Sequence, residues 1–326
     1  MKKVIVTGAT GFLGMHLIDE LIRNNFEVIA VCRRLPEKSY SQAVTFYQGD
    51  IEDPYSLREA FIQASIVVHA AALVSADPTD NHQMYQTNVI GTRNVVDACL
   101  FSGVKRLIYV SSVAALIGDS APEKISEPQP WNGPLAGYGY TKYKGGMEVR
   151  RGEAEGLEVV FIHPSVIFGP GDADRSSGKI LKLIRNGLPF APRGVLNGVD
   201  ARDVSELLVR MIKGEGTGKN FVVSGFSMNW KDFYESVLRG YGNSKRILII
   251  PTQFAILFIW IYEKLSRLIR LRPLITVNAI KMATSGNSYD SKIVAKELGF
   301  IFRTPEETLN WLVNTKSSEF RQFKQN

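Results

Sequence analysis

Short apolar runs alternate along the first half of the chain with segments whose apolar positions recur at helical spacing. The runs are rich in β-branched residues and apolar at successive positions, which is typical of strands buried on both faces of a parallel sheet. They lie at residues 2–8, 26–34, 44–48, 65–70, 105–112, 157–163 and 219–225. Asp53 followed by Pro54 marks the start of a helix between two of them. Strand and helix in alternation predict an α/β fold with a doubly wound parallel sheet.

The pattern becomes less regular after residue 165. Glycines and prolines are frequent up to residue 194, with one amphipathic helix among them, and residues 226–326 are predicted to be mostly helical. Such segments are expected where a chain leaves its sheet to cover a substrate. We therefore predict a nucleotide-binding domain at 1–165, to which 195–225 returns, and a smaller, discontinuous substrate domain at 166–194 and 226–326.

The most apolar segment of the chain is ILIIPTQFAILFIWIY at residues 247–262. Its 16 residues are interrupted by Pro251 and Gln253, and a helix that crosses a bilayer needs roughly 20. A buried helix over the substrate pocket is the favoured interpretation. The alternative is peripheral membrane contact through residues 251–272, where the basic stretch EKLSRLIRLR would meet anionic head groups.

The composition is ordinary for a soluble globular protein, with 326 residues, 45% of them hydrophobic and 22% charged. The net charge of +7 is scattered outside 263–272, which favours attraction for anionic ligands, and we find no nucleic-acid motif. Cys32 and Cys99 match neither a metal-ligand spacing nor a disulfide framework, and no signal-peptide core precedes the first glycines. We therefore expect a cytoplasmic protein without a bound metal, membrane-associated only through the alternative above.

Gly8, Gly11 and Gly14 stand at the junction between the first predicted strand and the first predicted helix. A strand, a glycine turn and a helix N-terminus form an anion site, because free N–H groups and the helix dipole both favour a pyrophosphate. Glycines also let the backbone approach the ligand and let the helix pack closely on the strand. The junction predicts a Rossmann dinucleotide site with Gly8, Thr10, Gly11, Phe12, Leu13 and Gly14 around the cofactor.

The second predicted strand ends in Arg33 and Arg34. Sites that prefer NAD usually carry an acidic residue here to hold the adenosine ribose hydroxyls, whereas an arginine suits the 2′-phosphate of NADP. We therefore predict NADP as the cofactor. Alternatively, the two arginines are ordinary surface residues at a strand end, and NAD is then also possible as the cofactor.

The stretch GYGYTKYKGG at 137–146 contains two Tyr–Lys pairs, Tyr138–Lys142 and Tyr140–Lys144. Residues at i and i+4 share one face of a helix, so either pair can form a proton-transfer device. The pairs begin two residues apart, about 200° around the helix axis, so they point in nearly opposite directions.

The two faces of this helix differ in character. The face of Tyr140 carries a charged stripe, which is typical of solvent exposure, and its members are Lys144, Glu148, Arg151 and Glu155. The face of Tyr138 carries small or apolar residues that would let the helix lie close to a sheet and a cofactor, namely Gly145, Gly146 and Val149. This facing argument assigns the catalytic role to Tyr138 and Lys142.

Several short motifs occur together in one order along the chain. They are TGATGFLG (7–14), GDIED (49–53), HAAA (69–72), Asn88 with Gly91 and Thr92, SSVAALIG (111–118), YGYTK (138–142) and HPSVIFGPGD (163–172). Their order and approximate spacing resemble those of the extended short-chain dehydrogenases/reductases. The segment at 272–300 is similar to the C-terminal region of the branch with dihydroflavonol reductases and 3β-hydroxysteroid dehydrogenases.

The resemblance implies roles for individual residues. Ser112, with Ser111 second, would hold the substrate oxygen, and Tyr138 would transfer the proton while hydride passes to or from the nicotinamide. Lys142 would bind the nicotinamide ribose and lower the pKa of Tyr138. The remaining cofactor contacts that it implies are Asp50 and Ile51 beside the adenine, Ala70, Ala71 and Ala72 along the cofactor, and Pro164 and Ser165 near the nicotinamide.

Three positions need separate mention. Asn88 resembles a structural asparagine behind the site. His163 stands where relatives usually carry arginine, and we give it no catalytic role. Gly146 stands where many relatives carry glutamate.

Three functions are compatible with these residues. The first is an NADP-dependent oxidoreductase that interconverts a secondary alcohol and a ketone on a bulky apolar small molecule. The second is a nucleoside-diphosphate-sugar epimerase or dehydratase, in which Arg175 and the positive charge would serve a diphosphate. The third is a cofactor-binding scaffold or sensor without turnover. Relatives often dimerise through helices that flank the sheet, so a homodimer is also expected.

Overall fold

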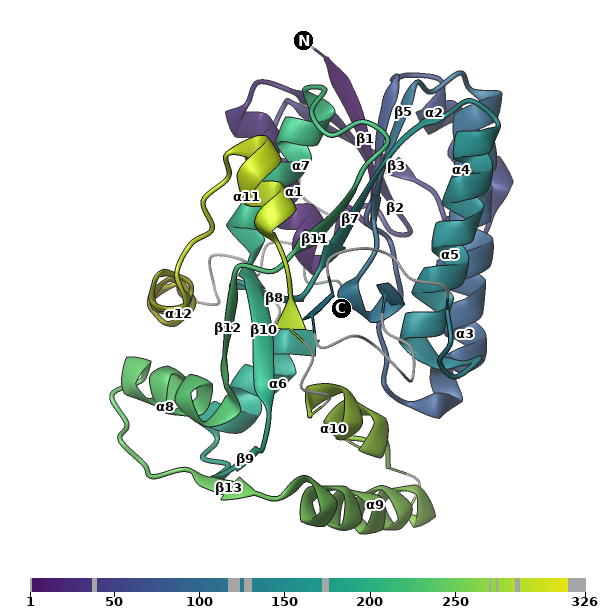
Figure 1. Cartoon of the computed structure of the whole chain (residues 1–326). Coiled ribbons are helices and arrows are strands. Elements are labelled where there is room, and N and C mark those ends of the chain that lie inside the picture. Colours follow the sequence, from purple (N-terminus) through teal and green to yellow (C-terminus); the bar gives the residue numbers. More distant parts are fainter. Residues whose placement is uncertain are drawn as a thin grey trace.

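The computed structural model describes residues 2–36, 40–116, 124–125, 131–171, 176–269, 271–273, 275–284 and 288–315. Its centre is a seven-stranded sheet in the order β11-β7-β5-β4-β1-β2-β3, with all neighbours parallel (Figure 1). The strands are β1 (Lys3–Thr7), β2 (Glu27–Cys32), β3 (Val44–Gln48), β4 (Ile66–His69), β5 (Arg106–Val110), β7 (Glu158–Pro164) and β11 (Asn220–Val223). Each predicted strand is present, and the predicted doubly wound α/β class is confirmed.

Helices cover both faces of this sheet (Figure 1). One face carries α1 (Phe12–Arg23), α7 (Ala201–Ile212) and α11 (Lys292–Leu298), and the other carries α2 (Arg58–Phe61), α4 (Gly91–Phe101) and α5 (Gly137–Ala154). The short α3 (Asn81–Tyr85) continues through a π-helical turn, η3 (Gln86–Ile90), into α4. The helix predicted at Asp53 begins as the 3-10 turn η1 (Pro54–Leu57). Asp53 caps this turn, because its carboxylate accepts a hydrogen bond from the Tyr55 N–H.

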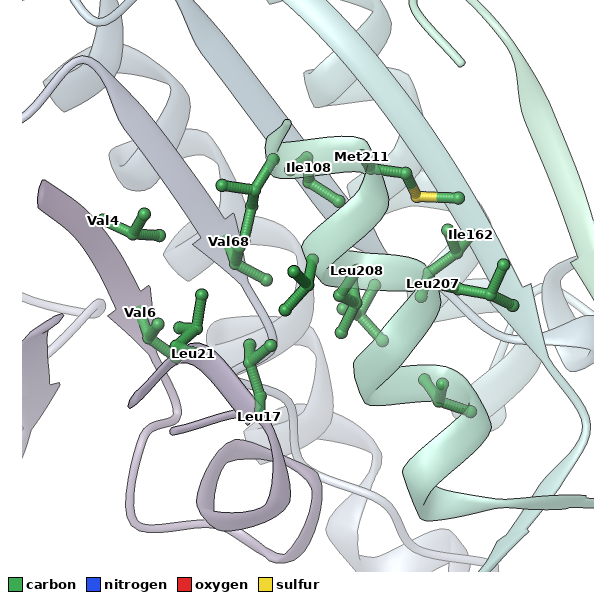
Figure 2. Close-up of a cluster of buried hydrophobic side chains, with 14 of the residues drawn as sticks. Val4, Val6, Leu17, Leu21, Val68, Ile108, Ile162, Leu207, Leu208 and Met211 are labelled. Atoms are coloured by element: carbon green, nitrogen blue, oxygen red, sulfur yellow. The ribbon is translucent and has the colours of Figure 1, made fainter. Parts of the chain in front are cut away.

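Successive side chains of β1 enter two separate cores. Val4 and Val6 pack against α1 and α7, whereas Ile5 packs on the opposite face of the sheet. Figure 2 shows the first core, in which α1 contributes Leu17 and Leu21 and α7 contributes Leu207, Leu208 and Met211. Burial on both faces explains why these strands are apolar at successive positions.

A second, smaller unit lies beyond the carboxyl ends of the parallel strands (Figure 1). Its three-stranded sheet pairs β10 (Val195–Asp200) with β8 (Val166–Phe168) in parallel and with β12 (Phe226–Asn229) in antiparallel. The core of the unit contains Phe168, Ile184 of α6 (Ser176–Arg185) and Phe233 of α8 (Trp230–Gly240). Beside it, β9 (Phe190–Pro192) pairs with β13 (Leu248–Ile250). Short β6 (Lys124–Ile125) pairs with β14 (Ser288–Tyr289).

The C-terminal segment departs from the predicted domain boundary, which placed all of 226–326 in the substrate domain. Val294 of α11 and the following Phe300 are buried in the same core as Val4 and Leu17. The Arg210 guanidinium of α7 also donates a hydrogen bond to the Leu298 carbonyl oxygen, at 2.7 Å. Helix α11 therefore covers the nucleotide-binding sheet, and only the next helix, α12 (Pro305–Asn314), packs on α8.

The apolar segment near residue 255 is not the buried helix that was favoured. It forms α9 (Thr252–Leu268), in which only Ala255 and Ser266 are buried. A shorter helix, α10 (Val277–Ala283), packs beside it. Within the described ranges, no helix is long and apolar enough to cross a membrane.

Candidate active site

The glycine turn joins β1 to α1 at the carboxyl edge of the sheet. Gly8 has a φ of +71°, and a Cβ atom there would lie 2.6 Å from the backbone nitrogen of Ala71. A Cβ atom on Gly14 would lie 2.7 Å from the carbonyl oxygen of Ala9 and closer still to that of Gly8. Only glycine therefore lets the turn and the helix start approach each other and β4 this closely.

The first turn of α1 has the properties of an anion site. Gly11 occupies the N-cap without a side-chain hydrogen bond, and the first turn contains no acidic residue. The N–H groups there are thus left for an anion, and the helix dipole favours one. Thr10, Phe12 and Leu13 are half-buried around this point. These residues fit the pyrophosphate of a dinucleotide.

Two neighbouring strand ends carry the residues assigned to the adenosine half. Arg33 and Arg34 directly follow β2 and are exposed. Asp50 follows β3 and its carboxylate accepts a hydrogen bond from the Glu52 N–H at 3.0 Å. Ile51 is buried against Gly91, where a Cβ atom would lie 2.7 Å from the Ile51 side chain. Their contacts with a cofactor stay predictions.

Asn88 ties the end of β4 to helix α5. Ala70, Ala71 and Ala72 follow β4, and the next residue, Leu73, donates its N–H to the Asn88 amide oxygen at 2.8 Å. The Asn88 amide nitrogen donates to the Leu73 carbonyl at 2.9 Å and to the Thr141 hydroxyl at 3.0 Å. Asn88 is fully buried inside the π-helical turn η3, a local distortion that is frequent at functional sites.

The structure places Tyr138 and Lys142 on the side of α5 that faces the sheet. Lys142 is 1% exposed, and its Nζ donates a hydrogen bond to the Val110 carbonyl oxygen at 2.8 Å. The Tyr138 hydroxyl lies within hydrogen-bonding reach of the Ser112 side chain. Tyr140 instead packs on Trp131, with ring centroids 6.0 Å apart. On the Tyr140 face, Arg151 forms ion pairs with Glu148, Glu155 and Asp97. The geometry follows the facing argument, whereas the catalytic roles stay predictions.

Only one of the two adjacent glycines of α5 is needed for its close approach to the sheet. A Cβ atom on Gly145 would lie 2.8 Å from the Tyr109 hydroxyl oxygen and closer still to the Asn88 carbonyl oxygen. A Cβ atom on Gly146 would lie 3.7 Å from the Phe161 ring, an ordinary contact. The departure from the family pattern at Gly146 therefore has space for a side chain.

Burial sets the charge states of the Tyr–Lys pair. Burial raises the pKa of Tyr138 to about 12, although the hydrogen bond from Ser112 opposes this shift. Burial also lowers the pKa of Lys142 to about 7, because water no longer solvates its ammonium group. The sequence predicted that Lys142 lowers the pKa of Tyr138. In this structure the lysine bonds to Val110 instead, and Tyr138 is held protonated.

The serines lie beside this pair at two strand ends. Ser112 follows β5, and Ser111 before it donates its N–H to the Ile162 carbonyl oxygen of β7 at 2.8 Å. Pro164 ends β7 and Ser165 follows it. The Ser165 hydroxyl is buried and has no hydrogen-bond partner among the described residues. A buried hydroxyl without a partner fits contact with a ligand at this edge.

Two features of this site were missed by sequence reasoning. The fully buried Tyr109 supports helix α5, because the Lys142 Nζ lies 4.4 Å from the centroid of its ring. The Val110 carbonyl oxygen fixes the same ammonium group. The available signal for Tyr109 was a bulky tyrosine among the aliphatic residues Leu107, Ile108 and Val110 of β5, whereas a backbone acceptor such as the Val110 carbonyl leaves no signal in the sequence. Arg175, assigned to a diphosphate in the second hypothesis, lies outside the described residues.

Three histidines are buried and neutral at pH 7. Burial lowers the pKa of His16 and of His163 to about 4, and that of His69, held between the Thr7 and Thr92 hydroxyls, to about 3. In the unfolded chain each would titrate near pH 6.5. The unfolded state therefore binds more protons below that pH, and stability is complete above pH 6.5 and lost as the pH falls towards 4.

We expect the free energy of unfolding to fall by roughly 1.4 kcal/mol per pH unit for each of these histidines across that window. Urea denaturation at a series of pH values measures the slope. His69→Gln should make it shallower, and the exposed His82→Gln serves as the control with an unchanged slope. A wild-type stability that is flat from pH 7 to about pH 5 would contradict the burial argument.

Residues 4–224 match the family model described as the NAD dependent epimerase/dehydratase family. This match covers more than half of the sequence. The chain belongs to the NAD-dependent epimerase/dehydratase family. The resemblance stated from the motifs is thereby confirmed, and the glycine turn, the Asn88 bridge and the Tyr–Lys pair all lie within the matched range. Members of this family are NAD-dependent oxidoreductases and epimerases.

Individual family members named for two chemistries are similar to this chain. Sterol demethylase protein B of Methylococcus capsulatus is 28% identical, over 91% of this chain and 93% of the relative. The 3beta-hydroxysteroid-dehydrogenase/decarboxylase isoform 1 of Arabidopsis thaliana is 26% identical, over 91% and 75%. The crystal structure of UDP-glucose 4-epimerase from Thermotoga maritima has a TM-score of 0.76 at 21% identity, over 98% of both chains. That structural likeness shows a shared fold.

Proposed function

We propose that the protein is an NADP-dependent oxidoreductase that interconverts a secondary alcohol and a ketone on a bulky apolar substrate. The observation that carries the proposal is the cluster of Ser112, Tyr138 and Lys142 at the carboxyl edge of the sheet, where the glycine turn also lies. A hydroxyl donor, a half-buried phenol and a buried amine are groups that can carry out proton transfer to a carbonyl oxygen.

The residues of this chain divide the work as follows. Gly8 and the first turn of α1 would hold the pyrophosphate, Lys142 would hold the nicotinamide ribose, and the unpartnered Ser165 hydroxyl would be available to the nicotinamide. The bound nicotinamide supplies or accepts the hydride at the substrate carbon. Ser112 donates a hydrogen bond to the substrate oxygen, and Tyr138 gives that oxygen its proton as the alcohol forms. Lys142 lies one helical turn from Tyr138, and its protonated form would stabilise the resulting tyrosinate.

The raised pKa of Tyr138 keeps its phenol protonated at pH 7, which is the form that carbonyl reduction uses. A phenol that is protonated at pH 7 can donate its proton at once, whereas alcohol oxidation needs the tyrosinate first. The named chemistry of the similar sterol enzymes supports an apolar substrate with a ring-borne oxygen. The exposed apolar helix α9 agrees with a substrate of low water solubility.

A spectroscopic assay tests the proposal against its closest rival. Purified protein with NADPH and a panel of hydrophobic cyclic ketones should show a net loss of NADPH absorbance. With UDP-sugars and NAD⁺ or NADP⁺, it should leave the sugars unchanged. The epimerase hypothesis predicts the opposite, namely isomerised UDP-sugar without a net absorbance change. A protein that binds NADPH tightly but turns over neither panel would favour the scaffold hypothesis.

The cofactor preference is tested at the two exposed arginines after β2. We expect Arg33→Ala combined with Arg34→Ala to weaken NADP⁺ binding by roughly tenfold to a hundredfold, because the charge-assisted bonds to the 2′-phosphate are lost. NAD⁺ affinity should change less than about threefold, since no bond to its hydroxyls depends on a positive charge. Isothermal titration calorimetry measures both.

Arg23→Ala provides the matched control, because Arg23 lies at the far end of α1 and pairs with Glu20. Its NADP⁺ affinity should equal that of the wild type. Equal losses for both cofactors in the double variant, or wild-type binding of NAD⁺ that is tighter than that of NADP⁺, would count against NADP.

A further inference from the structure

Helix α9 exposes a continuous apolar stripe. Phe254, Phe258, Ile261 and Leu265 recur at helical spacing and are 55%, 62%, 41% and 56% exposed. Further exposed apolar side chains lie on the same helix, on strand β13 before it and in the segment after it. They are Leu257, Trp260 and Leu268 of α9, Leu248 and Ile249 of β13, and Ile269 and Leu271 after the helix. We call residues 248–271 of this set the apolar face. Contiguous exposed apolar patches mark surfaces that contact a partner or a membrane.

The orientation of α9 is fixed by contacts on its opposite side. Ala255 and Ser266 are buried there. Arg267 pairs with Asp77 at 3.2 Å, and the Thr276 hydroxyl, at the N-cap of the neighbouring α10, donates to the Ala76 carbonyl oxygen at 3.1 Å. These bonds hold α9 against the loop that follows β4. The stripe therefore faces outward because its other side is anchored.

Positive charge is concentrated around the same helix. Residues 243–284 contain seven of the chain's 39 lysines and arginines and one of its 32 aspartates and glutamates. The segment thus carries a net charge of +6, against +7 for the whole chain. Arg267 and Arg272 are used in ion pairs with the body of the protein, whereas Lys245, Arg246, Lys264 and Lys281 are exposed. The segment that carries the apolar face is therefore also rich in exposed cations.

We propose that α9 is a membrane-docking helix that lies in the head-group region of an anionic lipid bilayer with its apolar face inserted. An apolar stripe with aromatic residues and exposed lysines and arginines in the same segment matches the chemistry of that interface, which offers hydrocarbon below and phosphate above. A second copy of the chain is the less suitable occupant, because a symmetric contact would bring the exposed cations of two copies, namely Lys245, Arg246, Lys264 and Lys281, towards each other.

The docking helix lies on the same side of the molecule as the candidate active site. The parallel strands run from the N-terminal side of Figure 1 towards α9 and α10, so their carboxyl ends face these helices. Asp77 and Ala76, which anchor α9, follow Ala70, Ala71 and Ala72 by a few residues. A docked protein would hold this edge of the sheet towards the bilayer. If the proposed function holds, its apolar substrate could be taken directly from the lipid.

Vesicle sedimentation of the full chain tests the docking. Wild-type protein should bind vesicles with about 30 mol% phosphatidylglycerol at least tenfold more tightly than pure phosphatidylcholine vesicles, and salt should weaken the difference. Phe258→Glu combined with Leu265→Glu should lower binding to the anionic vesicles at least tenfold. Ile301→Glu is the control, because Ile301 is an apolar residue outside this surface and is even more exposed, at 90%. It should bind like the wild type.

Trp260 gives a second measurement that needs no disruptive variant. Bromine-labelled lipids should quench part of the wild-type fluorescence, and Trp260→Phe should remove that part, because Trp260 would lie at the hydrocarbon boundary. No sedimentation of the wild type with either vesicle, no quenching, or equal losses in the Ile301 control would each overturn the proposal. The proposal would also be overturned if the wild type formed a stable dimer, the Phe258/Leu265 double variant were monomeric, and neither protein bound vesicles. None of these readouts depends on turnover, so the proposed function can fail separately.

Discussion

Replacing Tyr138 by phenylalanine is expected to lower kcat by about a thousandfold or more, while the affinity for NADP⁺ changes less than about twofold. The substitution removes only the hydroxyl that Ser112 contacts and leaves the ring and the position of Lys142 unchanged. The proton transfer is lost, whereas the groups assigned to the pyrophosphate and the ribose remain. Steady-state kinetics on a ketone that is turned over, with calorimetry for the cofactor, measure the two quantities.

Tyr140→Phe is the internal control for this result. Tyr140 begins the other Tyr–Lys pair of the same helix, but its ring packs on Trp131 away from Ser112. Its kcat should stay within about threefold of the wild-type value, because no reacting group is removed. A severe loss in Tyr140→Phe with a mild one in Tyr138→Phe would reverse the assignment of the pair.

The parts of the fold that local sequence dictates were predictable. Runs such as KVIVT are apolar at successive positions because both faces of the strand are buried, and this property is visible in the sequence. The glycine turn and the Asp53–Pro54 helix start depend on backbone geometry that few residue types permit. The facing of α5 was predictable because a charged stripe can only point to solvent.

What depends on contacts between distant segments was not predictable. The apolar character of α9 indicated burial, but burial also needs another element to cover the helix, and hydropathy does not say whether one exists. Helix α11 joins the first core because its apolar face meets β11, a pairing across about 70 residues that no local pattern encodes. The hydrogen bond from Lys142 to the Val110 carbonyl oxygen likewise involves a backbone atom that every residue carries.

The candidate site depends on α5 lying very close to the sheet, and Gly145 is where that closeness can be tested. We expect Gly145→Ala to reduce the free energy of unfolding by about 3 kcal/mol, because the added methyl group would overlap the Asn88 carbonyl and the Tyr109 hydroxyl. Neither group can move easily. The Asn88 carbonyl belongs to the backbone of a buried π-helical turn, and the Tyr109 side chain is fully buried. The helix must shift outward instead, which carries Tyr138 and Lys142 away from Ser112, so kcat should fall as well.

Gly146→Ala is the matched control one position along the helix. Its methyl group has space beside Phe161, and alanine is the better helix former, so stability should rise by about 0.5–1 kcal/mol with kcat unchanged. Urea denaturation of both variants decides the matter, since equal stabilities would mean that the close packing of α5 does not hold the catalytic pair in place.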